Sequence, residues 1–266
     1  MRRLNPFTTV VGTLSLVFLY LPLLAVAVMS INKTRFGLVW GGFTLQWYQQ
    51  LFHNADVLEY TRNTLVLALV STLISTVLGT ALALGVERFR WGQRARGAIE
   101  TVLYLPIVTP DIIFAAALVV AFGLLQTVFS IFQPGLTTMI IGHVTFQVSF
   151  VALVVQSRLI GLGRDIEEAA YDLYADYPGL LRRVLLPLLT PGIVSGALLA
   201  FTLSLDDFII SFFTYGPTSQ TLPIYIYASI KRGITPELHA LSTLIFILTL
   251  CLVIGSERLT RRGATT

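Results

Sequence analysis

Three aspartates lie inside long stretches that are otherwise almost wholly apolar: Asp111, Asp206 and Asp207. A carboxylate within a bilayer is energetically expensive, so such residues usually line a transport pathway or meet a partner. No lysine or arginine lies inside the same stretches, and an anion site would need arginines or helix N-termini. We therefore expect the carboxylates to recognise a cation, with Phe208 and Tyr225 adding cation–π contacts.

Helix geometry limits how these acids act together. Asp206 and Asp207 point about 100° apart on a helix, so at most one of them faces a cavity squarely. Counted from the expected helix starts, Asp111 is about 18 Å and Asp206 about 21 Å along, which places Asp111 near mid-bilayer and Asp206 somewhat nearer the outside. The alternative is structural, because Asp111 follows Pro110 and could cap a broken helix, and the Asp206–Asp207 pair could serve the same purpose.

The sequence contains no catalytic constellation. A Walker A loop needs Gly-Lys ahead of Ser or Thr, whereas the two lysines, Lys33 and Lys231, follow Asn and Ile. The three histidines are far apart in the chain and lack metal-ligand spacing: His53, His143 and His239. His143 and Gln147 lie one turn apart, and we expect them to form hydrogen bonds that pack helices rather than a substrate contact. We expect a non-enzyme with no metal and no cofactor of its own.

Composition indicates an integral membrane protein. The 266 residues are 55% hydrophobic and 12% charged, against about a quarter charged in soluble domains. A net charge of +4 would ordinarily raise the question of nucleic acid, but here the charges lie between apolar runs and are better explained by membrane topology. The single cysteine, Cys251, excludes a disulfide framework.

Six apolar runs predict an all-α protein with six membrane-spanning helices in one domain, residues 1–266. The expected spans are about 7–29, 61–86, 99–125, 136–157, 192–213 and 240–255, with a charged loop at about 158–190. The first run has a basic start and a possible cleavage site, as in a signal peptide. Its length of about twenty residues favours an uncleaved helix.

The distribution of basic residues predicts which side of the membrane each loop between these spans faces. With both termini inside, 13 lysines and arginines are cytoplasmic and 5 are external. This bias follows the positive-inside rule. It places residues 87–96 and the charged loop on the cytoplasmic side, and residues 31–60 and 215–238 outside.

The charged loop carries a specific spacing. Glu168, Ala169 and Ala170 are followed seventeen residues after that last alanine by Pro187, in a Val-Leu-Leu-Pro ending. This resembles the coupling loop of ABC importer membrane subunits, whose pattern is E-A-A, three residues, Gly, nine residues, an apolar residue, any residue, Leu and Pro. Only Tyr174 departs, where the family places Gly. The alternative is a solvated acidic face on an amphipathic surface helix.

The resemblance implies a type I ABC importer permease fold. The loop would form a pair of short cytoplasmic helices that docks on an ATPase through Glu168, Ala169, Ala170, Tyr174 and Pro187. Glycine permits left-handed backbone angles where two helices turn on one another. Tyrosine at this position therefore puts the geometry of the turn in question more than the docking itself.

The resemblance narrows further to the polyamine (spermidine/putrescine) branch of these permeases. It is carried by the run FTLSLDDFIISFFTYGP from Phe201, by Leu-Pro-Ile-Tyr at 222–225 and by Pro-Glu at 236–237. It implies the second membrane subunit of a bacterial inner-membrane importer. Its partners would be a related permease in a heterodimer, two ATPase subunits that bind ATP and Mg, an extracytoplasmic binding protein and membrane lipid, with no nucleic acid.

Three other functions compete with this one. The same architecture could import another solute, such as ferric iron or an anion. A half-size secondary transporter would normally show internal repeat symmetry, and we see none. A non-transporting scaffold would have no reason to keep carboxylates inside its spans.

Overall fold

The computed structural model describes residues 6–34 and 39–263, and every regular element in these ranges is a helix. The only β-bridge within them is an isolated one between Asn32 and Phe43. The expectation of an all-helical protein is confirmed. Arg2, Arg3 and Arg35, which contribute to the charge bias, lie outside the described residues. The chain forms two compact units, one of residues 1–58 with 225–266 and the other of residues 59–224.

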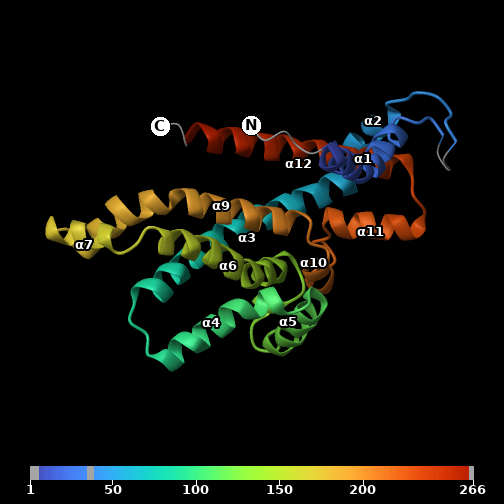
Figure 1. Ribbon diagram of the computed structural model, residues 1–266. Helices are drawn as coiled ribbons and strands as arrows, with labels where there is room; N and C mark the ends of the chain where they lie inside the picture. Colours follow the sequence, from blue (N-terminus) through green and yellow to red (C-terminus); the bar gives the residue numbers. More distant parts are fainter. Residues whose placement is uncertain (1–5, 35–38, 264–266) are drawn as a thin grey trace. The chain divides into compact units, whose positions relative to one another are not determined.

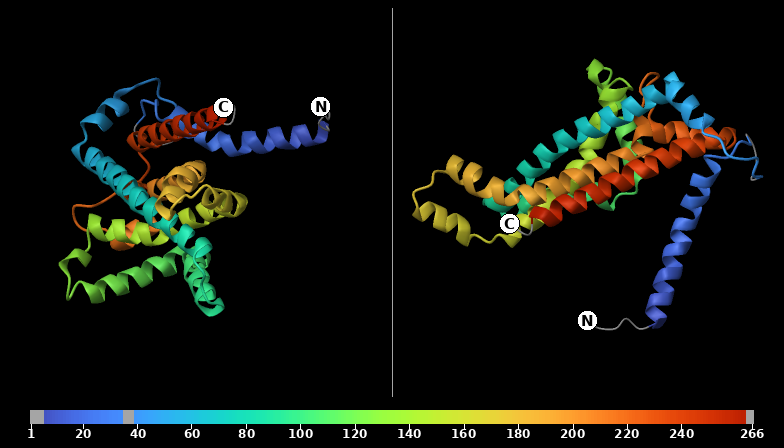
Figure 2. Two further views of the ribbon diagram at one scale, coloured as in Figure 1. Left: turned by 90° about the vertical axis from the view of Figure 1, so that its left-hand side faces the viewer. Right: turned by 90° about the horizontal axis from the view of Figure 1, so that it is seen from above.

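In the first unit, the C-terminal helix α12 contacts both α1 and α2 (Figures 1 and 2). The bounds are Pro6–Met29 for α1, Gln46–His53 for α2 and Pro236–Gly263 for α12, and the unit also holds most of α11 (Leu222–Arg232). Polar contacts fix the connecting segments. The buried Trp47 indole Nε1 donates to the Asn32 carbonyl at 2.8 Å, and Asn54 Nδ2 donates to Glu237 Oε1 at 3.0 Å.

The second unit is built around α6 and α9, which lie side by side (Figures 1 and 2). Its elements are α3 (Ala55–Arg88, which begins in the first unit), α4 (Gln93–Val108), α5 (Asp111–Leu125), a 3₁₀ turn (Ser130–Phe132), α6 (Leu136–Gly161), α7 (Asp165–Asp172), α8 (Tyr177–Gly179), a π-helical stretch (Leu180–Leu185), α9 (Leu186–Leu205) and α10 (Ile209–Thr214).

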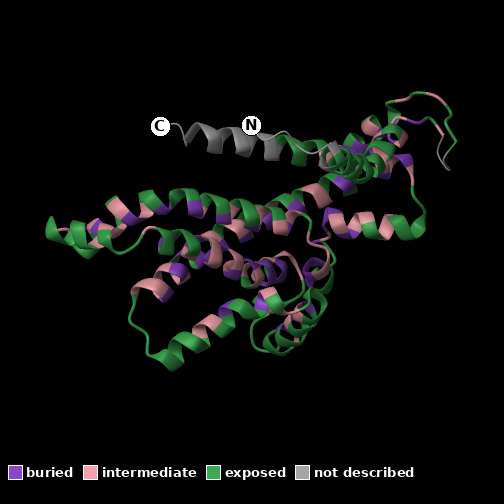
Figure 3. Ribbon diagram, in the orientation of Figure 1, coloured by how far each residue is buried: buried purple, intermediate pink, exposed green. Residues whose placement is uncertain are grey.

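Small residues allow α9 to approach α6 closely. Four buried positions recur every fourth residue along α9: Gly192, Gly196, Ala200 and Ser204. A Cβ on Gly192 would lie 3.0 Å from Arg158 Cβ, and a Cβ on Gly196 would lie 3.3 Å from Val151 Cγ1. Such stripes let backbones meet inside a membrane, where no hydrophobic force distinguishes a helix from lipid. The buried faces appear purple in Figure 3.

A second stripe of small residues lies on α3. Ser71 and Ser75 are fully buried, and a Cβ on Gly79 would lie 2.7 Å from Val151 Cβ. The stripe therefore packs α3 against α6, as small-residue faces do between membrane helices.

The expected third span, 99–125, is not a single straight helix. The structure has α4 and α5, which are bent by 112° at Thr109–Pro110 (Figure 1). A residue before proline is pushed out of the helical region, and Thr109 is accordingly extended (φ −75°, ψ 132°). The depth of Asp111 counted along one straight helix is therefore wrong.

The expected fifth span, 192–213, also differs from the structure. A continuous helix runs from Tyr177 to Leu205, so it begins inside the charged loop and is longer at its start. It then breaks at residues 206–208 before α10. Asp206 and Asp207 thus lie in a break between two helices and not within a regular turn.

Four helices of the described chain are long and apolar enough to cross a membrane, or five crossings result if the bent pair counts as one. The four are 9–29, 55–88, 136–161 and 177–205. Among the described residues of α12, the apolar stretch Pro236–Cys251 is shorter than these four. The count of six spans stays a prediction.

Candidate functional site

The Asp207 carboxylate organises the break between α9 and α10. Its Oδ1 accepts the Ile210 backbone N–H at 3.3 Å, and its Oδ2 accepts that of Ser211 at 2.8 Å. The first N–H groups of a helix have no partner within it, so a carboxylate here satisfies them and complements the helix dipole. The Asp207 side chain is only 15% exposed, which shows that it points into the protein.

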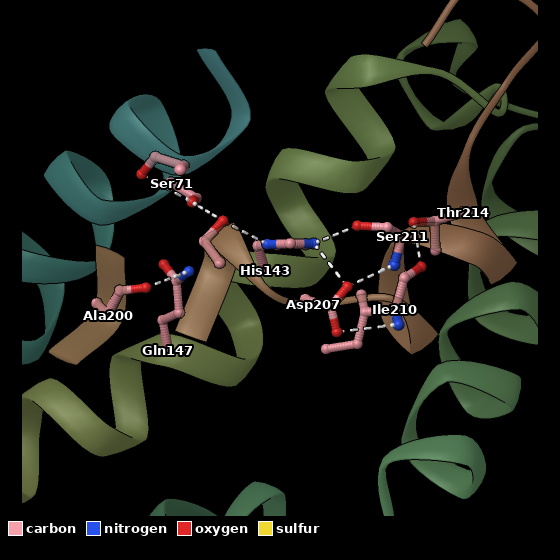
Figure 4. A network of polar contacts seen from close by, with 10 residues as sticks. Ser71, His143, Gln147, Ala200, Asp207, Ile210, Ser211 and Thr214 are labelled. Carbon is pink, nitrogen blue, oxygen red and sulfur yellow. Dashed lines mark hydrogen bonds and ion pairs between the residues drawn. The ribbon is translucent and has the colours of Figure 1, made fainter. Parts of the chain in front are cut away.

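His143 of α6 holds both sides of this break (Figure 4). Its Nε2 lies 3.2 Å from Asp207 Oδ2 and 3.0 Å from Ser211 Oγ, and its Nδ1 lies 2.8 Å from Ser204 Oγ. When Asp207 is ionised it can only accept hydrogen bonds, so its contact with His143 is a hydrogen bond in the tautomer that has the proton on Nε2. The ring therefore ties the end of α9 and the start of α10 to α6.

The network continues to α3 through hydroxyl and amide groups (Figure 4). Ser204 Oγ lies 3.3 Å from Ser71 Oγ. Gln147 Nε2 donates to the Ala200 carbonyl at 3.1 Å and its Oε1 accepts from Ser75 Oγ at 2.8 Å. His143 and Gln147 both hold helices together, as expected, but each does so through its own partners.

The other predicted pathway residues have different surroundings. Asp206 is exposed, and within the described chain its side chain makes no hydrogen bond or ion pair. Asp111 is also exposed, as the first residue of α5, and it takes no part in the network. Phe208 packs on Phe212 with ring centroids 5.2 Å apart. Tyr225 belongs to the first unit.

Reasoning from the sequence did not anticipate the link between His143 and Asp207. Two features of the sequence could have indicated this link. Ser204, Asp207 and Ser211 recur at spacings of three and four residues in one apolar run, and His143 lies in another apolar run. A histidine in such a run needs polar partners, because an unsatisfied polar group is costly away from water. Among the described residues, no group of three or more His, Cys, Asp and Glu side chains could hold a metal ion.

The charged loop forms two helical segments separated by a turn. In α7, Glu168 and Ala169 are exposed, whereas Ala170 is buried against a cluster that includes Leu180 and Leu185. Pro187 is the second residue of α9 and directly follows the π-helical stretch Leu180–Leu185, an irregularity of the kind that accommodates a missing backbone N–H. One face of α7 thus packs on the protein, and the face with Glu168 is open.

Tyr174 adopts the backbone conformation that usually requires glycine. Its φ is +61°. The Ala175 N–H donates to the Ala170 carbonyl at 3.0 Å and the Tyr174 N–H to the Tyr171 carbonyl at 2.9 Å, the two bonds that close a helix in a Schellman motif. Tyr174 therefore closes α7 in a left-handed conformation, at a cost of about 1–2 kcal/mol for the Cβ.

Charged contacts fasten this loop to the end of α3. Arg88 Nε lies 2.5 Å from Glu167 Oε1, with both side chains largely buried. Arg88 Nη2 also approaches the Leu159 and Gly163 carbonyls at 3.4 Å, and Gln156 Nε2 donates to Glu87 Oε1 at 2.6 Å. The Arg88–Glu167 pair therefore joins α7 directly to the end of α3.

A bundle of apolar helices with a buried intramembrane network and an open charged loop is the architecture of a membrane transport subunit. The chain belongs to the family of binding-protein-dependent transport system inner membrane components, whose signature matches residues 75–262.

Two bacterial permeases are similar along most of the chain. The spermidine/putrescine transport system permease protein PotC of Escherichia coli strain K12 is 36% identical over 244 residues, 92% of this chain and 90% of that protein. The putrescine transport system permease protein PotI of the same strain is 36% identical over 242 residues, 91% of this chain and 86% of that protein.

The fold is also similar to solved structures. A crystal structure of a bacterial ABC transporter involved in the import of the acidic polysaccharide alginate superimposes with a TM-score of 0.76. The match covers 96% of this chain and 94% of that one at 19% sequence identity. At this identity the likeness bears on the fold alone.

Proposed function

We propose that this chain is the permease subunit of an ATP-driven importer that carries polyamines, spermidine or putrescine, across the bacterial inner membrane. The observation that carries the proposal is the 36% identity to polyamine permeases over about nine-tenths of the chain. The whole chain, residues 1–266, acts as one multi-pass domain with six spans and both termini in the cytoplasm.

The proposed cation pathway passes the break between α9 and α10. Asp206 is exposed there, next to Phe208, and no lysine or arginine lies within the surrounding run of the sequence. Protonated amines pair with carboxylates through charge-assisted hydrogen bonds and with aromatic faces through cation–π contacts. Asp111 and Tyr225 are further candidates for this pathway, and Asp207 supports it from within.

The proposed drive is a contact between the α7 loop and an ATPase subunit. Glu168 and Ala169 are on its open face, Ala170 packs α7 on the protein, and Tyr174 and Pro187 shape the turn and the following helix. Two ATPase subunits would bind ATP and Mg and hydrolyse the ATP, so this subunit is not itself an enzyme. A second permease would complete the membrane channel, and an extracytoplasmic binding protein would deliver the substrate.

The other functions left open by the sequence are not favoured. The two relatives described above are named for polyamines, not for ferric iron or an anion. Membership of a binding-protein-dependent family argues against a half-size secondary transporter, which works without a binding protein or an ATPase.

The proposal is tested by purifying the complex through a tag on this chain and placing it in lipid nanodiscs. ATP hydrolysis is then measured with the binding protein loaded with spermidine, putrescine, ferric iron or phosphate. We expect stimulation by the two polyamines only. Stimulation by ferric iron or phosphate with none by polyamines would overturn the assignment of the substrate.

A further inference from the structure

The exposed carboxylate of Asp206 is oriented by its backbone alone. Within the described chain its side chain makes no hydrogen bond or ion pair. On one side its N–H donates to the Thr202 carbonyl at 3.4 Å, a long bond at the last turn of α9. On the other side it is joined to Asp207. The direction in which Asp206 points therefore depends on what holds Asp207 in place.

The Asp207 carboxylate has a single tie to the packed pair of helices α6 and α9. Its two backbone donors belong to α10, a helix of six residues. Among the described residues its remaining partner is His143 of α6, whose Nε2 lies 3.2 Å from Asp207 Oδ2. The far end of α10 is fixed to α6 separately, because Thr138 Oγ1 donates to the Thr214 carbonyl at 3.1 Å. Loss of the histidine bond would therefore loosen the break itself and leave α10 in place.

The His143 ring contacts the chain on both sides of Asp206 (Figure 4). Nδ1 lies 2.8 Å from Ser204 Oγ at the end of α9, and Nε2 lies 3.0 Å from Ser211 Oγ at the start of α10. The ring is only 2% exposed, and a buried polar network whose members are all bonded is rigid. Because Asp206 lies between the two serines in the chain, the ring bridges the break at the point where the exposed carboxylate is.

We propose that His143 is a positioning residue for the cation site: it holds Asp207 through Nε2 and so aims the Asp206 carboxylate at an ammonium group of the polyamine. This inference rests on the proposed function, in which Asp206 meets the cation. A binding group is effective only when supporting residues hold it in the productive geometry. Because Asp207 is occupied by His143 and by the N–H groups of α10, the break offers the cation one free carboxylate.

The test compares two amides at position 143. The side-chain nitrogen of glutamine reaches about as far as Nε2 of histidine, and that of asparagine about as far as Nδ1. His143→Gln can therefore keep the bond to Asp207, whereas His143→Asn can keep only the bond to Ser204. Each complete membrane complex is placed in nanodiscs of neutral lipid without binding protein, and its equilibrium binding of radiolabelled spermidine is measured. We expect His143→Gln to bind nearly as the unsubstituted complex does and His143→Asn to bind at least about tenfold more weakly, as when a metal ligand loses its supporting partner.

Gln147→Leu is the matched control for packing. Gln147 lies one turn from His143 on α6, is 1% exposed, and bonds the Ala200 carbonyl and Ser75, which are not part of the break. The substitution should lower the melting temperature of the permease, because two buried partners lose their hydrogen bonds. It should leave the affinity for spermidine unchanged, since Asp207 keeps all its bonds.

Unchanged spermidine affinity of the His143→Asn complex would overturn the inference. A loss in the His143→Gln complex as large as in His143→Asn would also overturn it, because the bond to Asp207 would then not be what matters. An equal loss in Gln147→Leu would assign the effect to packing alone. Asp206→Asn separates the two proposals. If it abolishes binding while His143→Asn binds normally, the cation site stands and only the role of His143 is wrong. If Asp206→Asn itself binds normally, the cation site fails.

Discussion

Two adjacent aspartates in the break after α9 have different surroundings. Asp207 accepts two backbone N–H groups of α10 and pairs with His143, and its side chain is 15% exposed. Asp206 is exposed, and its side chain has no such bonds in the described chain. Helical geometry predicts only that at most one of them faces a cavity squarely. Asp207 therefore holds the break, and we propose Asp206 as the residue that meets a solute.

Substitution by asparagine separates these roles. Asp206→Asn should strongly reduce polyamine uptake without changing the stability of the permease, since its side chain supports no other element. Asp207→Asn should reduce uptake and also lower the free energy of unfolding by about 1–3 kcal/mol, because charge-assisted hydrogen bonds are lost from a largely buried site. Uptake by membrane vesicles and thermal unfolding in detergent check both, with Asp111→Asn expected to have the smaller effect. Normal uptake by Asp206→Asn would refute its role.

Most substitutions lower the free energy of unfolding, but backbone strain at Tyr174 predicts that replacing it with glycine raises that free energy. Tyr174→Gly should raise the free energy of unfolding by about 1 kcal/mol, because glycine adopts φ +61° without a Cβ penalty. The matched control is Gly163→Ala, at φ +68° with open space around it, which should lower stability by a similar amount. Thermal unfolding of the two variants measures both changes. Destabilisation by Tyr174→Gly would contradict the left-handed conformation of Tyr174.

At the scale of elements, the sequence predicts the helices better than the breaks between them. Apolar runs locate α1, α3 and α6 to within a few residues at most ends. Pro110 predicts an interruption, but a bend of 112° depends on what α5 packs against. The residues around the break at Asp206 include no proline or glycine that would predict an interruption of the helix. It depends on His143, which is 63 residues earlier in the chain.

In the charged loop, too, some features are predictable from the sequence and others depend on how the helices pack. The resemblance implies a pair of short helices. The structure has one short helix, α7, and after the turn a helix that runs continuously from Tyr177 to Leu205. Nothing local in the sequence pairs Glu167 with Arg88, because the two residues are brought together only when α3 packs beside α6. The ion pair and the left-handed Tyr174 are therefore findings of the structure.

The Arg88–Glu167 pair should transmit movement of α7 to α3. Glu167→Lys leaves a largely buried arginine beside a second cation, which should cost about 3–5 kcal/mol and reduce transport-linked ATP hydrolysis. The charge-swapped double variant, Glu167→Lys with Arg88→Glu, should recover much of that loss. A double-mutant cycle on stability and on polyamine-stimulated hydrolysis measures the coupling. Independent, additive effects of the two substitutions would contradict a direct link.

At the scale of the whole molecule, the distribution of basic residues predicts the orientation of every loop. Single cysteines at Gln49 and Thr218, in a Cys251→Ser background, should react with an impermeant thiol reagent in intact cells, and a cysteine at Gln93 should not. All three positions are exposed, so lack of reaction reports the side of the membrane. Reaction of the cysteine at Gln93, with no reaction at the other two positions, would show that the predicted orientation is wrong.

The central claim is that carboxylates of this permease recognise a polyamine during ATP-driven import. It is tested most directly by uptake of radiolabelled spermidine into proteoliposomes that contain the complete complex, with ATP on the ATPase side and binding protein on the other. We predict ATP-dependent accumulation by the unsubstituted complex. Little should remain in a fully assembled complex that carries Asp111→Asn, Asp206→Asn and Asp207→Asn together. Full uptake by that triple variant would contradict the account.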